Sequence, residues 1–143
     1  MYVEVKKTVD VPIDGLWALL GDFANEGAAT GLVVEKGEGF GLGATCTSGV
    51  EGHRIWEMCV NHDPEKFIVS YIIDMGETPI YDYIGTARLH FVDVNHTMIH
   101  WYSHWRWRDL LGNENSIEDW ERLMKNAYIT VIDNMVKKVK GGH

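Results

Sequence analysis

Residues 86–108 read TARLHFVDVNHTMIHWYSHWRWR, two runs of alternating apolar and polar side chains joined by Asp93-Val94-Asn95. Alternation with a period of two predicts strands with one buried face, and a short polar connection between them predicts an antiparallel hairpin. A three-residue loop with Asn95 in a left-handed conformation gives a register in which the inward-facing residues of both strands match. This register predicts three facing pairs: Phe91 with Thr97, Leu89 with Ile99, and Ala87 with Trp101.

The second run separates its side chains into an aromatic face and a histidine face. One face carries Thr97, Ile99, Trp101, Ser103, Trp105 and Trp107. The other carries Met98, His100, Tyr102, His104 and Arg106. We expect the tryptophan face to point into the protein, where burial of large apolar rings is favourable, and the histidines to point outward.

The rest of the chain extends this hairpin into a larger antiparallel sheet. Strands are expected over residues 3–9, 32–39, 43–50, 53–60, 66–74, 79–92 and 97–107. The breaks after residue 37 are too short for parallel crossovers, which need an intervening helix. Helical spacing predicts short helices over 13–23 and 24–29, and a helix of about twenty residues after the capping-box-like Ser116-Ile-Glu-Asp119. The expected fold class is α+β.

Length and composition place the chain among soluble globular proteins. With 143 residues, 45% of them hydrophobic, it can fold as a single domain over residues 1–143. A net charge of −8 argues against nucleic acid, which is bound by clustered lysine and arginine. Two isolated cysteines, with no run resembling a signal peptide or a membrane span, predict a cytoplasmic protein with no stable membrane insertion.

Two patterns that could indicate a metal or a cofactor are weak. His100 and His104 lie four residues apart on one strand, hence about 13 Å apart, too far to share an ion. The run Gly39-x-Gly41-x-x-Ala44 satisfies a dinucleotide pattern, but no helix follows to face a pyrophosphate. We therefore expect neither a metal nor a cofactor.

The order of the elements and several motifs resemble the SRPBCC superfamily, the START-like helix-grip proteins that include polyketide cyclases and lipid-transport domains. The motifs are VPIDGLWALLGDF (11–23), GFGLG (39–43), IWEMCVNHD (55–63), VSYII (69–73), PIYDYIGT (79–86) and the tryptophan-rich strand. The resemblance implies a seven-stranded antiparallel sheet curled around the long carboxy-terminal helix, two short helices after the first strand, and an internal cavity for a small apolar or aromatic molecule. Bacterial members often carry an arginine where this chain has Cys46, so an anionic ligand group lacks that partner.

The resemblance places one group of residues at the cavity. They are Tyr71, Tyr81, Tyr83, Trp101, Trp105, Trp120, Met124 and Tyr128. Rings with a polar tip suit a ligand pocket, because they bury apolar area while an O–H or N–H group fixes the orientation of the ligand. The alternative is that these residues simply fill the core.

Glu57 is a weak candidate for catalysis. It shares a face with Ile55 and Cys59, and an inward position in an apolar interior would suit it as a general acid or base. Trp56 and Met58 on the opposite face are equally apolar, so the alternation leaves the direction of Glu57 open. A surface or ion-paired carboxylate is the alternative.

Three functions fit these observations. A carrier or binding protein for a small hydrophobic, aromatic or lipid-like molecule needs only an apolar cavity with a few polar anchors. An enzyme of the polyketide cyclase or aromatase type needs Glu57, or a pocket tyrosine or histidine, to face the ligand. An interaction module would use the outward His100, Tyr102 and His104, and it predicts a homodimer.

Overall fold

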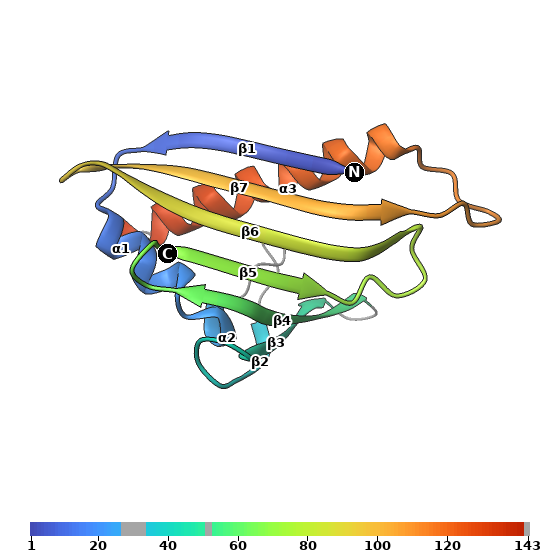
Figure 1. Ribbon diagram of the computed structural model, residues 1–143, viewed down its shortest axis with the longest axis horizontal. Helices are drawn as coiled ribbons and strands as arrows, with labels where there is room; N and C mark the ends of the chain where they lie inside the picture. Colours follow the sequence, from blue (N-terminus) through green and yellow to red (C-terminus); the bar gives the residue numbers. More distant parts are fainter. Residues whose placement is uncertain (27–33, 51–52, 142–143) are drawn as a thin grey trace.

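Seven antiparallel strands form one curved sheet, and a long carboxy-terminal helix lies across one face of that sheet (Figure 1). The structure is a computed structural model that describes residues 1–26, 34–50 and 53–141. The strands lie in the order β1-β7-β6-β5-β4-β3-β2. This is the helix-grip architecture predicted from the sequence.

The strands and helices lie close to the positions that their patterns predict. The strands are β1 (Tyr2–Val9), β2 (Val34–Glu38), β3 (Thr45–Val50), β4 (His53–Asp63), β5 (Ile68–Ile73), β6 (Ile80–Asp93) and β7 (His96–Trp107). The helices are α1 (Ile13–Leu20), α2 (Phe23–Glu26) and α3 (Ile117–Val139). The predictions over residues 27–29 and 32–33 fall outside the described residues.

The β6–β7 hairpin has the predicted register, but its turn differs from the prediction. The facing pairs are Phe91 with Thr97, Leu89 with Ile99, and Ala87 with Trp101. Asp93 pairs with His96, so the loop has two residues, Val94 and Asn95, in place of the predicted three, and Asn95 is not left-handed. The Asp93 carboxylate lies 2.8 Å from both the Asn95 amide and the His96 ring, which stabilises the tight turn. An irregularity between Phe91 and Asp93 accommodates the change in pairing.

Strand β4 continues beyond the break that was predicted at Asn61. The pairing of β4 with β5 shifts between Cys59 and Asn61 and then continues to Asp63. At this shift the Cys59 thiol donates to the Asn61 carbonyl oxygen at 3.3 Å. Such a bulge bends the strand and increases its twist, so it helps the sheet to curve around α3.

Both ends of α3 are fixed by polar contacts. At its start, the Ser116 side chain accepts from the Asp119 amide at 3.1 Å, and the Asp119 carboxylate accepts from the Ser116 amide at 3.0 Å. The predicted capping box is therefore present, with aspartate in place of the usual glutamate. At the other end, the Lys138 ammonium lies 2.6 Å from the Glu26 carboxylate of α2.

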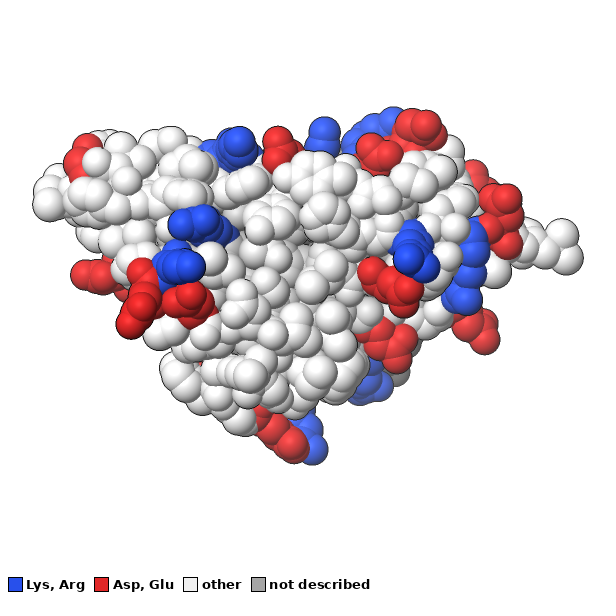
Figure 2. Space-filling model, in the orientation of Figure 1, with Lys and Arg blue, Asp and Glu red and all other residues white. Residues whose placement is uncertain are grey.

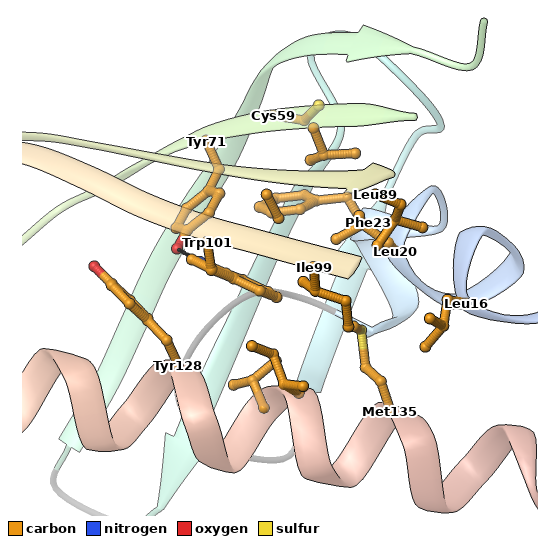
Figure 3. Close-up of a cluster of buried hydrophobic side chains, with 14 of the residues drawn as sticks. Leu16, Leu20, Phe23, Cys59, Tyr71, Leu89, Ile99, Trp101, Tyr128 and Met135 are labelled. Carbon is orange, nitrogen blue, oxygen red and sulfur yellow. Dashed lines mark hydrogen bonds between the residues drawn. The ribbon is translucent and has the colours of Figure 1, made fainter. Parts of the chain in front are cut away.

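The apolar core lies between the inner face of the sheet and the helices (Figure 3). Side chains from α1, α2 and α3 meet the inward-facing residues of the central strands there. The residues labelled in this cluster include Leu16, Leu20, Phe23, Leu89, Ile99 and Met135. The same interior also contains the buried polar side chains of Ser48, Glu57 and Ser103.

The outer face of the sheet carries the aromatic and histidine side chains that alternation placed there. His104 is exposed, and His100 and Tyr102 are half-buried. The rings of Tyr2 and His104 are 4.9 Å apart, and those of His100 and Tyr102 are 4.6 Å apart. Figure 2 shows the molecule with the strands in front, and a broad central area of this view carries neither cationic nor anionic side chains. The homodimer suggested by this face stays a prediction.

Candidate functional site

Buried hydroxyl groups form a continuous row across the interior, from β5 to β7. The Trp101 indole donates to the Tyr71 hydroxyl at 2.8 Å, and the Tyr71 and Tyr83 hydroxyls are 3.3 Å apart. The Tyr83 and Tyr128 hydroxyls are 2.5 Å apart, and Tyr128 donates to Ser103 at 2.6 Å. Figure 3 shows Tyr71, Trp101 and Tyr128 turned toward one another from three different elements. We call these five residues the hydroxyl row.

The two ends of the hydroxyl row fix the direction of every bond within it. An indole N–H can only donate, so Tyr71 accepts from Trp101, while Tyr128 gives its hydrogen to Ser103. Each phenol has a single hydrogen. Tyr83 must therefore donate to Tyr128, and Tyr71 must donate to Tyr83.

The phenols of the hydroxyl row stay protonated. Burial raises the pKa of Tyr71, Tyr83 and Tyr128 above the ordinary value of 10.0. A neighbouring phenol adds to this rise in the pKa of each of the three groups. At neutral pH these groups can donate and accept hydrogen bonds, but they do not supply a phenolate base.

The ring of Tyr71 lies directly against the backbone of β6. Its strand partner there is Gly85. A Cβ atom at position 85 would meet the Tyr71 ring, with the hydroxyl oxygen only 2.5 Å away. The absence of a side chain at Gly85 is therefore what allows Tyr71 to reach the hydroxyl row.

Glu57 points into the interior, which resolves the direction that the sequence left open. It is fully buried, whereas the adjacent Trp56 is 41% exposed on the outer face. The thiol of Cys46, its partner on β3, donates to the Glu57 carboxylate with a sulfur–oxygen distance of 3.6 Å. Burial, and then the charge of Glu57, raises the pKa of Cys46 from 9.0 to about 12. Glu57 lies two residues before Cys59, the strand partner of Tyr71, and its charge contributes to the raised pKa of Tyr71.

Three buried polar atoms at the interior have no hydrogen-bond partner in the part of the chain that the structure describes. They are Ser48 Oγ on β3, Trp105 Nε1 on β7 and Trp120 Nε1 on α3. Buried polar groups in proteins are nearly always paired, and leaving one unpaired costs about 1–3 kcal/mol. Sequence reasoning did not select Ser48, although its alternation with Cys46 on one strand was the available signal.

The structure brings most of the predicted pocket residues together. Those buried or packed against the core are Tyr71, Tyr83, Trp101, Trp105, Trp120, Met124 and Tyr128. Tyr81 does not join them, because it is half-buried and its ring lies 5.8 Å from the Arg108 guanidinium. Asp82 has a φ of 51°, and the pairing of β6 shifts between Tyr81 and Ile84, so alternation is interrupted there. Ligand contact by any of these residues stays a prediction.

A groove of about 280 Å³ lies on the surface between β1 and α3, apart from the hydroxyl row. Its lining includes Lys7, Asp10, Asp133 and the imidazole of His96. The Lys7 ammonium lies 2.7 Å from the Asp133 carboxylate, so these charges satisfy each other. A groove of this kind does not match a hydrophobic ligand, and we place the candidate site in the aromatic interior instead.

Within residues 1–26, 34–50 and 53–141, no group of three or more His, Cys, Asp or Glu side chains is placed to hold a metal ion. Over the same residues, no helix is both long and apolar enough to cross a membrane. The Nε2 atom of His100, one of the histidines on the outer face of β7, lies 3.0 Å from the Glu4 carboxylate.

Stability is expected to fall as the pH rises above 9, because Cys46 ionises at about pH 9 in the unfolded chain but only at about pH 12 in the folded one. The unfolded state then binds fewer protons, so the free energy of unfolding falls by up to about 1.4 kcal/mol per pH unit for each such thiol. Urea unfolding at intervals from pH 7 to about pH 10 measures this slope. Cys46→Ala should reduce it between pH 9 and 10, and an unchanged slope would contradict the assignment.

Solved structures with this fold confirm the architecture at low sequence identity. An uncharacterised protein from Bacillus thuringiensis is 13% identical with a TM-score of 0.76, covering 97% of this chain and 98% of its own. Norcoclaurine synthase from Thalictrum flavum is 14% identical with a TM-score of 0.71, covering 100% of this chain and 87% of its own. An aromatase/cyclase from Streptomyces is 20% identical with a TM-score of 0.69, and the match covers 100% of this chain and 99% of the aromatase/cyclase.

No curated protein matches the sequence of this chain. A family model does match, and its description, polyketide cyclase / dehydrase and lipid transport, agrees with the superfamily that the sequence motifs resemble. The match extends over residues 2–140, from β1 to the end of α3. The chain therefore belongs to the polyketide cyclase / dehydrase and lipid transport family.

Proposed function

We propose that this chain binds a small aromatic or otherwise hydrophobic molecule between the inner face of the sheet and α3. The observation that carries the proposal is the set of unpartnered polar atoms, Ser48 Oγ, Trp105 Nε1 and Trp120 Nε1, on three separate elements. They lie among aromatic and apolar side chains. Ligand sites combine a predominantly apolar lining with a few polar groups that fix orientation.

The comparisons support a ligand of this size and chemistry. Norcoclaurine synthase, which shares the fold, has been crystallised in complex with dopamine and hydroxybenzaldehyde, both small aromatic molecules. The family description includes lipid transport, which extends the range to aliphatic ligands. In the simplest form of the proposal the chain is a carrier, which needs affinity but no reacting group.

We expect native mass spectrometry of freshly purified protein to show the added mass of a small organic molecule that denaturing conditions remove. Titration calorimetry with one-ring and two-ring aromatic ketones, phenols and medium-chain fatty acids provides the second measurement. Saturable binding of one of these classes would support the proposal. The proposal would be overturned by an unmodified native mass together with no saturable binding by any of the three classes.

A cyclase is the second candidate, and the inward position of Glu57 beside the hydroxyl row is the observation that favours it. A carboxylate can remove a proton from the carbon between two carbonyl groups of a polyketide chain. The resulting carbanion attacks another carbonyl of the same chain, and the alkoxide then regains a proton. The phenol hydrogens are already used within the row, so the donor available to the developing alkoxide is an unpartnered indole N–H group such as that of Trp105.

Glu57→Gln separates the two candidates, because it keeps the shape of the side chain and removes the base. If the chain is a cyclase, turnover should fall by about a hundredfold or more while ligand affinity changes little. Turnover is measured by product formation from a short poly-β-ketone, and affinity by calorimetry on the same preparation. Unchanged turnover would remove Glu57 from catalysis and leave the carrier function in place.

A further inference from the structure

Two indole N–H groups lie buried without a partner at the same end of the interior. Trp105 is 2% exposed, and the Nε1 atoms of both Trp105 and Trp120 lack a hydrogen-bond partner among the described residues. The neighbouring tryptophans of β7 differ in this respect. Trp101 donates to Tyr71 at 2.8 Å and Trp107 donates to Asp109 at 3.2 Å.

The contact between α3 and β7 sets the relative position of these two indoles. Tyr128 of α3 donates to Ser103 of β7 at 2.6 Å, which aligns the helix with the strand. Trp105 lies about 7 Å further along β7 from that contact. Trp120 lies about 12 Å back along α3 from it. Figure 1 shows that the end of β7 and the start of α3 lie at the same end of the molecule, so both indoles are displaced in the same direction.

The chemistry of the interior restricts what these donors can bind. An indole N–H is a donor only, so its partner must be an acceptor. No lysine or arginine occurs among the buried side chains that the structure describes, whereas Glu57 is one of them. A carboxylate ligand group would lose its hydration beside another carboxylate and gain no cation in exchange. An uncharged acceptor, such as a ketone or quinone oxygen, avoids both costs.

We infer that Trp105 and Trp120 recognise an uncharged acceptor oxygen of the ligand, so that the chain selects aromatic carbonyl compounds over hydrocarbons and over carboxylates. This inference rests on the proposed function and specifies its ligand class. The carbonyl oxygen lies at the end of the interior where β7 ends and α3 begins. The aromatic part of the ligand extends from there toward the hydroxyl row.

Isosteric ligands test the inference directly. Methyl naphthyl ketone and isopropenylnaphthalene have nearly the same shape, but a methylene group replaces the carbonyl oxygen in the second. Their dissociation constants are measured by calorimetry for the full chain and for Trp105→Phe, Trp120→Phe and the double variant. Trp56→Phe is the matched control, because Trp56 lies on the outer face and is 41% exposed. Naphthoate is the charged comparison.

The measured quantity is the ratio of ketone affinity to alkene affinity within each protein. We expect each inner tryptophan variant to lower this ratio by about fivefold and the double variant to bring about a larger loss. Trp56→Phe should leave the ratio unchanged. A variant that is partly unfolded loses affinity for both ligands together, so its ratio still reports on the N–H group.

The outcomes distinguish this inference from the function on which it rests. Saturable binding of both ligands, with a ratio that the inner variants do not change, would overturn the inference and leave ligand binding established. Tighter binding of naphthoate than of the ketone would also overturn it. No binding of either naphthalene by the unmodified chain would overturn the inference, and the calorimetric panel under the proposed function then decides whether any ligand class binds.

Discussion

Replacement of Gly85 by alanine is expected to lower the free energy of unfolding by about 3 kcal/mol, because overpacking adds to the loss of buried hydrogen bonds. The added methyl group would occupy space that the Tyr71 ring now fills, with the hydroxyl oxygen 2.5 Å from the new Cβ. Tyr71 is buried among Phe23, Tyr83 and Trp101, so its ring has little room to move. Displacement of the ring would also break the bond from Trp101 and leave that indole unpaired.

A double-mutant cycle isolates this contact. Tyr71→Ala removes the ring, and in that background Gly85→Ala should cost less than about 1 kcal/mol. The backbone of Gly85 does not have a positive φ, so alanine is compatible with its conformation. Urea unfolding of the four proteins gives the coupling energy. Additive effects of the two substitutions would contradict the close approach of the ring to Gly85.

Trp101→Ala is expected to lower the free energy of unfolding by about 4 kcal/mol, within the range for removal of a buried tryptophan. The side chain is fully buried. Its ring stacks on Tyr128 with centroids 6.0 Å apart and meets the edge of Tyr71 at 6.3 Å. The substitution therefore opens a cavity at the centre of the interior and removes the first donor of the hydroxyl row.

Two further variants separate the causes of this loss. Trp101→Phe keeps much of the buried area and removes the N–H group, so it should cost about 1–2 kcal/mol. Trp56→Ala removes an indole that is 41% exposed on the outer face, and its cost should be much smaller than that of Trp101→Ala. Urea unfolding at neutral pH measures all three. Similar losses for Trp56→Ala and Trp101→Ala would contradict the central position of Trp101.

The sequence predicts the fold well where the alternation of side chains is unbroken. Along β7, every second residue from Thr97 to Trp105 is buried, as the pattern indicates. The hairpin register followed because two such patterns had to match across one turn. The start of α3 was equally clear, since Ser116 and Asp119 have a spacing with a specific capping geometry.

The sequence did not predict the direction of side chains or the geometry of the turn where the backbone is irregular. Tyr81 and Tyr83 have the same parity in the sequence, but the left-handed Asp82 and the shifted pairing separate them. Nothing in PIYDYIGT marks this irregularity, because aspartate at that position is equally compatible with a regular strand. The turn after Asp93 differs for a related reason, since its geometry depends on bonds made by the Asp93 side chain.

The candidate site needed information that alternation does not contain. The pattern around Glu57 was apolar on both faces, so only the sheet itself could show which face is covered. The packing of α3 against β7 decides which tryptophan N–H groups have a hydrogen-bond partner and which do not. The inward position of most of the aromatic side chains was therefore predictable from the sequence. Which of their polar atoms have no hydrogen-bond partner was not.

The fixed direction of the hydroxyl row limits how protons can move inside this protein. Reversing the row would turn the Tyr71 hydrogen toward the Trp101 indole, so that one donor would face another. Proton hopping along a chain of hydroxyls requires such a reversal to restore the starting arrangement. The three tyrosines therefore cannot relay protons repeatedly. Their O–H dipoles are aligned and all point toward Ser103.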